Sequence, residues 1–244
     1  GLLSTMVVSS RMAFFSDSLG HGAFTGIAVG ALVGIFAPLT SLILFSVLFA
    51  LLITYIKHRT AASADTVIGV FSSTAIAVGL MMMSHGGGFS KFSPLLIGDI
   101  LSITPADLAG LLAVDALVFL GWVMLFNRLL LLSVNPSLAR SRGICVFGIE
   151  SLFAALLAVV VAVSIQWVGI LIINALLVLP GAGARNIARS VKEYHLVSVM
   201  IAFVSGLVGL FSAYYLGIAA GAAIVAAAAV MFFLSLALRP HFQR

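Results

Sequence analysis

Charged residues are scarce in this sequence of 244 residues. Asp, Glu, Lys and Arg together make up 8% of it, whereas a soluble domain carries about 25%. Hydrophobic residues make up 63%, and the mean hydropathy is +1.29. So few charges are insufficient to cover the surface of a water-soluble protein of this size. The composition therefore predicts a protein whose surface faces lipid.

Cysteine is scarcer still, because Cys145 is the only one in the sequence. A single cysteine excludes an intramolecular disulfide framework. Cys145 opens an apolar segment, so we expect it to be a small packing residue rather than a metal ligand.

Short motifs for ATP binding and hydrolysis are also missing. The sequence contains no Gly-x-x-x-x-Gly-Lys-[Ser/Thr] loop, no Gly-x-Ser-x-Gly elbow and no His-Glu-x-x-His pair. We therefore expect no enzymatic activity and no bound cofactor in this chain. The net charge is +5, but the basic residues are scattered over short gaps between apolar runs, so we expect no nucleic-acid partner.

Apolar runs, by contrast, are long and frequent. A spanning helix needs roughly 20 mainly apolar residues to cross about 30 Å of hydrocarbon. Runs of that kind occupy residues 19–36, 39–56, 65–83, 106–126, 144–164, 167–184, 195–213 and 217–238. An apolar stretch ending near Ser9 indicates a further helix that has lost its beginning. We predict an all-α polytopic bundle of about eight or nine spanning helices, forming one transmembrane domain over residues 1–244.

The positions of Lys and Arg predict the orientation of this bundle. If the gap at Lys57–Arg59 is cytoplasmic, alternation of the spans places eleven of the twelve basic residues on that side. Lys91 alone falls on the opposite side. Cytoplasmic loops carry an excess of Lys and Arg, so we expect the C-terminus inside and the missing N-terminal part outside.

Glycines recur at every fourth position in the first full apolar run: Gly22, Gly26, Gly30 and Gly34. On a helix they form one smooth stripe, and small residues let helices in lipid approach closely. We expect a packing face.

Ionisable side chains inside a membrane are costly, so each is a functional candidate. Asp17 and His21 are four residues apart, which places them one helical turn apart on the same face. A carboxylate oxygen and an imidazole nitrogen in that arrangement suit Zn²⁺ or Mn²⁺. The alternative is that Asp17 caps the helix and His21 merely packs.

Weaker candidates are Asp115, Glu150 and His85. Asp115 and Glu150 lie within predicted spans, where each could line a water-filled path or pair with a basic residue. These two carboxylates leave open a proton-coupled secondary transporter as the alternative function. His85 stands beside three glycines in an outer loop, as an entry ligand or a solvated residue. Asn174 is a candidate for a polar contact between helices.

The segment Val134–Gly143 falls in a predicted cytoplasmic loop but has the features of a short helix. Pro136 suits a first helical turn, Leu138 and Ala139 offer apolar contacts, and Gly143 suits the end. The alternative is a merely basic loop.

Four stretches of the sequence form an ordered set of motifs: Arg11-Met12-x-Phe14-Phe15-x-Asp17-x-Leu19-x-His21-x-x-x-x-Gly26, Asp65-Thr66-x-Ile68-Gly69, Leu96-x-Gly98-Asp99-Ile100-Leu101-x-Ile103-Thr104-x-x-Asp107-Leu108, and Val168-Gly169-x-Leu171-x-x-x-x-Leu176-x-x-x-Pro180-x-x-x-Ala184-Arg185. In these stretches and their order the sequence resembles the ABC-3 family, the membrane subunits of zinc, manganese and related metal importers. One departure is Pro180-Gly181-Ala182, where the family often has Pro-Ala-Ala.

The resemblance implies a homodimeric permease of the bacterial inner membrane, with a translocation path near the dimer axis. A periplasmic metal-binding protein is expected outside, and two cytosolic ATPase subunits inside. Asp17 and His21 match the family's metal ligands. The transported metal is expected to be zinc, with manganese or ferrous iron as alternatives. The short cytoplasmic helix is expected to couple to the ATPase through Asn135, Pro136, Ser137, Leu138, Ala139 and Arg140.

Overall fold

The computed structural model of the chain describes residues 1–33, 38–85 and 103–242. Within these ranges the structure is helical, as predicted. The helices are α1 (Leu2–Ser9), α2 (Ala13–Val33), α3 (Pro38–Arg59), α4 (Ala64–His85), α7 (Pro105–Val134), α8 (Pro136–Ser141), α9 (Val146–Val168), α10 (Ile170–Ile187), α11 (Val191–Leu216) and α12 (Ala220–Phe242). Gly34, Gly98 and Asp99 lie outside the described residues.

Each of the eight predicted apolar runs coincides with a helix, but the predicted number of membrane spans is not supported. In the described part of the chain, six helices are long and apolar enough to cross a bilayer: α3, α4, α7, α9, α11 and α12. Within this sequence α1 comprises eight residues, and the apolar part of α10 is Ile172–Ile187. The prediction counted every apolar run, whereas the six helices were counted by their length and hydropathy within the described residues.

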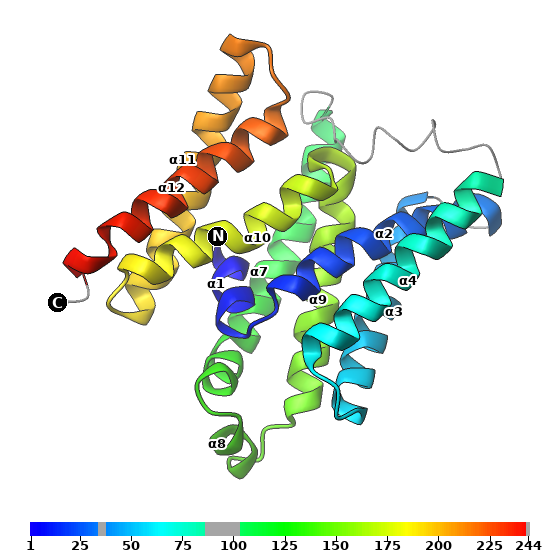
Figure 1. The fold of residues 1–244 in the computed structure, drawn as a ribbon, viewed down its shortest axis with the longest axis horizontal. Coiled ribbons are helices and arrows are strands. Elements are labelled where there is room, and N and C mark those ends of the chain that lie inside the picture. The colour runs from blue at the N-terminus through cyan, green and yellow to red at the C-terminus, as the bar shows by residue number, and fades with distance from the viewer. Residues whose placement is uncertain (34–37, 86–102, 243–244) are drawn as a thin grey trace.

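Helices α2 and α10 cross the middle of the molecule (Figure 1). On one side, α3 and α4 pack against α2; on the other, α11 and α12 form a hairpin in which α12 packs against α10. Helix α9 packs against α3, and α2 and α10 contact each other. The described residues of α2 are mostly buried, and those of α10 are buried or partly buried except Arg185. Five of the six spans therefore pack against these two central helices, and α7 stands apart from them.

The glycine stripe on α2 is confirmed as a packing face toward α3. A Cβ added to Gly22 would meet the ring of Phe49 at 2.8 Å, and one added to Gly26 would meet Phe45 at 2.9 Å. Such contacts leave no room for a methyl group on α2. The stripe therefore fixes how closely the two helices approach.

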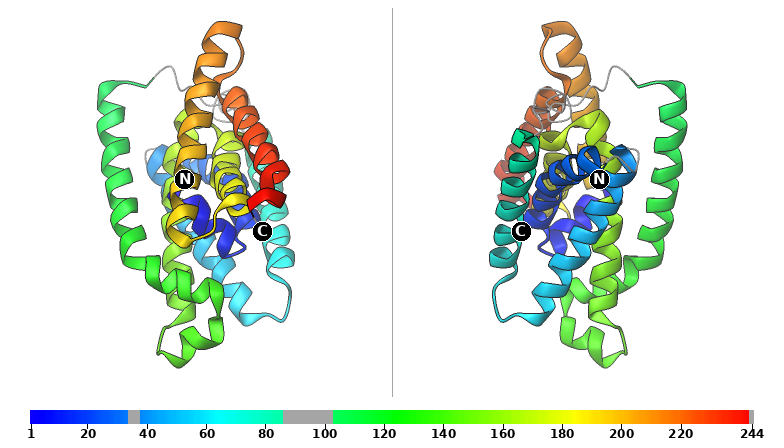
Figure 2. Two further views of the ribbon diagram at one scale, coloured as in Figure 1. Left: turned by 90° about the vertical axis from the view of Figure 1, so that its left-hand side faces the viewer. Right: turned by 90° about the vertical axis from the view of Figure 1, so that its right-hand side faces the viewer.

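Helix α7 stands at the periphery (Figure 2). It is 30 residues long and begins with a capping box, in which Thr104 accepts from the backbone N–H of Asp107 and the Asp107 carboxylate accepts from the backbone N–H of Thr104. Only 11% of its most apolar window is buried against the rest of the chain. Most of α7 therefore faces the surroundings of the protein.

Cys145 is exposed, contrary to the prediction that it packs. It occupies the residue before the first turn of α9, in the connection from α8. An apolar run gives the composition of a segment but not which of its ends emerges from the bundle, which is why the prediction was wrong.

Candidate metal site

Asp17 and His21 both lie on α2, as the spacing predicted. Helix α2 begins at Ala13, after a turn in which Arg11 adopts a φ of +56°. Asp17 is therefore the fifth residue of the helix and does not cap it, which makes the capping alternative wrong. The side chain of Asp17 is 53% exposed and that of His21 is 38% exposed. Both donors are accessible from outside the packed core.

The carboxylate and the imidazole stand at the spacing of two ligands of one metal ion. Asp17 Oδ2 lies 3.5 Å from His21 Nε2, which is long for a hydrogen bond. Two tetrahedral ligands that each lie 2.0–2.1 Å from a zinc ion are separated by about 3.4 Å. The pair can therefore receive a cation with little rearrangement.

Asn174 of α10 completes this cluster. Its Nδ2 donates to Asp17 Oδ1 over 2.9 Å, while its own Oδ1 is buried with no partner among the described residues. Gly20 makes the contact possible, because a Cβ there would lie 2.9 Å from Asn174 Nδ2. We predicted an interhelical contact for Asn174 but missed it as a site residue. The one available signal was an amide within an apolar run.

The described residues offer the site few side-chain atoms that could bind a metal ion. No group of three or more His, Cys, Asp or Glu side chains gathers anywhere in the described ranges. Asp17 and His21 supply one carboxylate and one imidazole, and any remaining ligands must come from water or from another molecule. Such a donor set can hold a cation only loosely.

Glu150 makes an ion pair elsewhere in the molecule. Its Oε2 lies 2.6 Å from Lys57 Nζ and 3.0 Å from His58 Nε2, so α9 is tied to the end of α3. Of the two alternatives left open for Glu150, the structure shows the pairing with a basic residue. The ion pair borders a cavity of about 350 Å³, which Arg11 and Pro136 also line.

The two other weak candidates lie on helices other than α2. Asp115 is exposed on α7, and His85 is the last residue of α4. The interactions of Asp17 and His21 described above include neither residue. Asp115 therefore adds no donor to the cluster.

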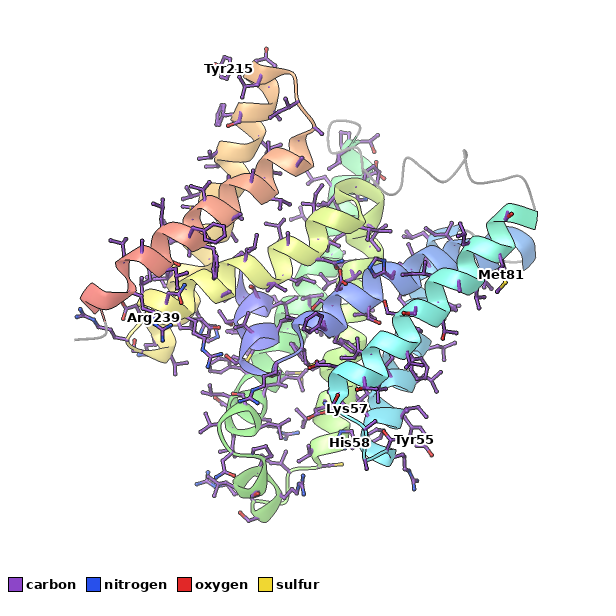
Figure 3. All side chains as sticks on the ribbon, viewed as in Figure 1. Tyr55, Lys57, His58, Met81, Tyr215 and Arg239 are labelled. Carbon is purple, nitrogen blue, oxygen red and sulfur yellow. The ribbon has the colours of Figure 1, made fainter. Side chains whose placement is uncertain are left out.

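The predicted short helix is α8. Asn135 precedes it, and its Oδ1 accepts from the backbone N–H groups of Ser137 and Leu138 at 3.0 and 3.1 Å. Ala139 is fully buried, whereas Leu138 is 42% exposed, so one apolar side chain anchors the helix and another faces outward. Gly143 follows the helix with a φ of +74°. Helix α8 lies at the same end of the molecule as Lys57 and His58, opposite Tyr215 (Figures 1 and 3).

Comparisons with known proteins agree along the length of the chain. The model of the ABC 3 transport family matches residues 1–239. The manganese import system permease protein ScaB of Streptococcus parasanguinis is 32% identical over 100% of this chain and 87% of its own length. The high-affinity zinc uptake system membrane protein ZnuB of Haemophilus influenzae is 30% identical over 96% of this chain and 90% of its own.

A solved structure supports the same fold. PsaBC from Streptococcus pneumoniae, determined in complex with a Fab, superposes with a TM-score of 0.80 at 28% sequence identity. The match covers 96% of this chain and 84% of the chain compared.

Proposed function

The chain belongs to the ABC 3 transport family, and from that premise we propose that it is the membrane permease of an ATP-driven importer of manganese or zinc. The observation that carries the proposal is the Asp17–His21 pair on α2, whose donor atoms are 3.5 Å apart. A carboxylate oxygen and an imidazole nitrogen suit both metals. The relatives' names divide between manganese and zinc, so zinc as the transported ion stays a prediction.

The cation passes through this site rather than staying there. Conduction requires binding that is favourable enough to admit the ion and weak enough to release it. Two protein donors, both partly exposed, meet that requirement better than a closed four-ligand site would. Asp17 and His21 are therefore transient ligands of the transported ion.

We assign one protein partner to each end of the molecule. A cytosolic ATPase contacts the end that carries α8, with Asn135–Arg140 as the coupling segment. A metal-binding protein delivers the cation at the opposite end, where Tyr215 is exposed. A second copy of the chain completes the path. The proposed location is the bacterial inner membrane, with the C-terminus in the cytoplasm.

Within residues 1–33, 38–85 and 103–242, no observation favours the proton-coupled alternative. That function requires a carboxylate inside the membrane that is not held in a fixed contact. Glu150 instead accepts from Lys57 and lies beside His58, an arrangement typical of a structural ion pair. Asp115 is exposed on α7.

Metal uptake by the assembled transporter tests the proposal. Cells would express the permease with its ATPase and its metal-binding protein, and uptake of manganese and of zinc would be measured in parallel. We expect uptake to require the ATPase and to be abolished by the double substitution Asp17→Ala and His21→Ala. Asn186→Ala, on α10, is the control that retains uptake. Undiminished uptake by the double variant, at equal protein level, would contradict the site assignment.

A further inference from the structure

Asn174 hydrogen-bonds the proposed metal ligand Asp17 from a different helix. We propose that Asn174 is a positioning residue of the transport site, which holds the Asp17 carboxylate so that one oxygen faces His21 at the spacing of two ligands of a single cation. This inference rests on the proposed function, because it assigns Asn174 a role in cation capture by Asp17 and His21.

The two oxygens of Asp17 have different partners. Oδ1 accepts from Asn174 Nδ2 over 2.9 Å, whereas Oδ2 faces His21 Nε2 over 3.5 Å. An aspartate that is 53% exposed and lacked this hydrogen bond would be free to rotate about its side-chain bonds. The amide removes that freedom, because a rotated carboxylate would lose the bond. The cation then meets one oriented oxygen and one nitrogen.

The hydrogen bond to Asp17 determines which way the Asn174 amide is oriented. A flipped amide would place its oxygen against the Asp17 carboxylate, where two acceptors repel each other and no hydrogen bond forms. In the orientation observed, Asn174 Oδ1 is buried without a partner among the described residues. The contact with Asp17 therefore decides how this side chain points, since its other end makes no hydrogen bond within the described ranges.

The backbone of α2 is adapted to this contact. Gly20 lies between Asp17 and His21 along the helix, and Asn174 and Ile170 occupy the space that a side chain there would need. A Cβ on Gly20 would lie 2.9 Å from Asn174 Nδ2 and 3.0 Å from Ile170 Cγ2. Helix α10 therefore approaches α2 closely at the point where the amide reaches the carboxylate.

A role in positioning predicts a defined change in transport kinetics. Residues that orient metal ligands commonly change affinity or activity by about 10- to 100-fold when they are replaced. In the complete transporter, Asn174→Ala is expected to raise the apparent KM for metal uptake by about 10-fold, with a smaller change in the maximal rate. Asn174→Leu, which keeps the branching at Cγ but removes the amide, is expected to do the same.

The matched control is Asn186→Ala. Asn186 also lies on α10 and also donates to another helix, over 3.0 Å to Ser235 Oγ of α12. It makes no contact with Asp17, so its loss should leave the apparent KM unchanged. A rise in KM that Asn186→Ala reproduces would overturn the proposal, because it would reflect loosened packing of α10.

A double-substitution cycle separates positioning from a structural role. Asn174 acts through Asp17, so Asn174→Ala should change the KM in the wild-type and His21→Ala backgrounds but not in Asp17→Ala, measured at raised metal concentration. An equal effect in the Asp17→Ala background would overturn the positioning role. If Asp17→Ala itself leaves uptake intact, the proposed function fails. If Asp17→Ala impairs uptake and Asn174→Ala does not, this inference alone fails.

Discussion

At the scale of single residues, Gly20 allows α10 to approach Asp17 closely. Its missing side chain leaves the space that Asn174 and Ile170 occupy. Gly20→Ala should therefore displace the Asn174 amide from Asp17, and we expect a rise in the apparent KM for metal uptake of about 10-fold.

The control for this substitution is Gly206→Ala on α11. No atom lies within 4 Å of a Cβ added there, so the change is sterically neutral and favours the helix slightly. Uptake kinetics measured for both variants at equal membrane levels provide the test. Normal kinetics for Gly20→Ala would show that α10 can shift without disturbing the site.

The sequence predicted that Asp17 and His21 lie together but not that Asn174 contacts Asp17. Asp17 and His21 are four residues apart, and helical periodicity alone places them together. Asn174 reaches Asp17 across 157 positions of sequence. Neither hydropathy nor spacing encodes which two helices touch, so this contact became visible only in the structure.

At the scale of elements, α8 depends on one capping side chain. Asn135 Oδ1 accepts from two backbone N–H groups at the start of a helix that is only six residues long. Asn135→Ala should cost about 1 kcal/mol of helix stability. If α8 is the contact with the ATPase, metal-stimulated ATP hydrolysis and uptake should fall together in this variant.

Asn135→Asp is the matched control, because aspartate retains the capping oxygen. A second variant, Leu138→Glu, places a charge on the exposed apolar side chain and should reduce co-purification of the ATPase with the permease. Retention of the ATPase by both Asn135→Ala and Leu138→Glu would argue that another segment forms the contact.

The predicted elements differed from the observed ones mainly at their ends. The run predicted at 106–126 became Pro105–Val134, because the helix continues through Asn127 and Arg128, where an apolar run stops. The run predicted at 19–36 began too late, since the turns that carry Asp17 are helical from Ala13. Hydrophobicity locates the part of a helix that suits lipid, whereas backbone hydrogen bonding and caps determine where it ends.

At the scale of the whole molecule, orientation in the membrane is open to a direct test. Cys145 is exposed beside α8, and it is the only cysteine of the chain. A membrane-impermeant maleimide should label Cys145 in inside-out vesicles and leave it unlabelled in intact spheroplasts.

The opposite end supplies the control. Tyr215 is 79% exposed at the turn between α11 and α12, so Tyr215→Cys in a Cys145→Ser background should label in intact spheroplasts. Labelling of Cys145 from outside would invert the proposed topology and place α8 away from the ATPase.

The fold class followed from composition, but the arrangement of the helices did not. Sparse charge and repeated apolar runs require a helical bundle in lipid. They do not reveal that α2 and α10 are central, because a buried helix and a lipid-facing helix can be equally apolar. The Glu150 contact with Lys57 and His58, which ties α9 to α3, likewise depends on the tertiary arrangement.

The length of α7 has a mechanical consequence. Its 30 residues extend over about 45 Å, roughly 15 Å more than the hydrocarbon core of a bilayer. Asn135 alone joins its end to α8, so the short helix is carried on a stiff extension of a membrane-embedded rod. A sideways force on α8 therefore acts at one end of α7 and would tilt the whole helix. Because little of α7 is buried against its neighbours, few contacts within the described chain oppose a change in its tilt.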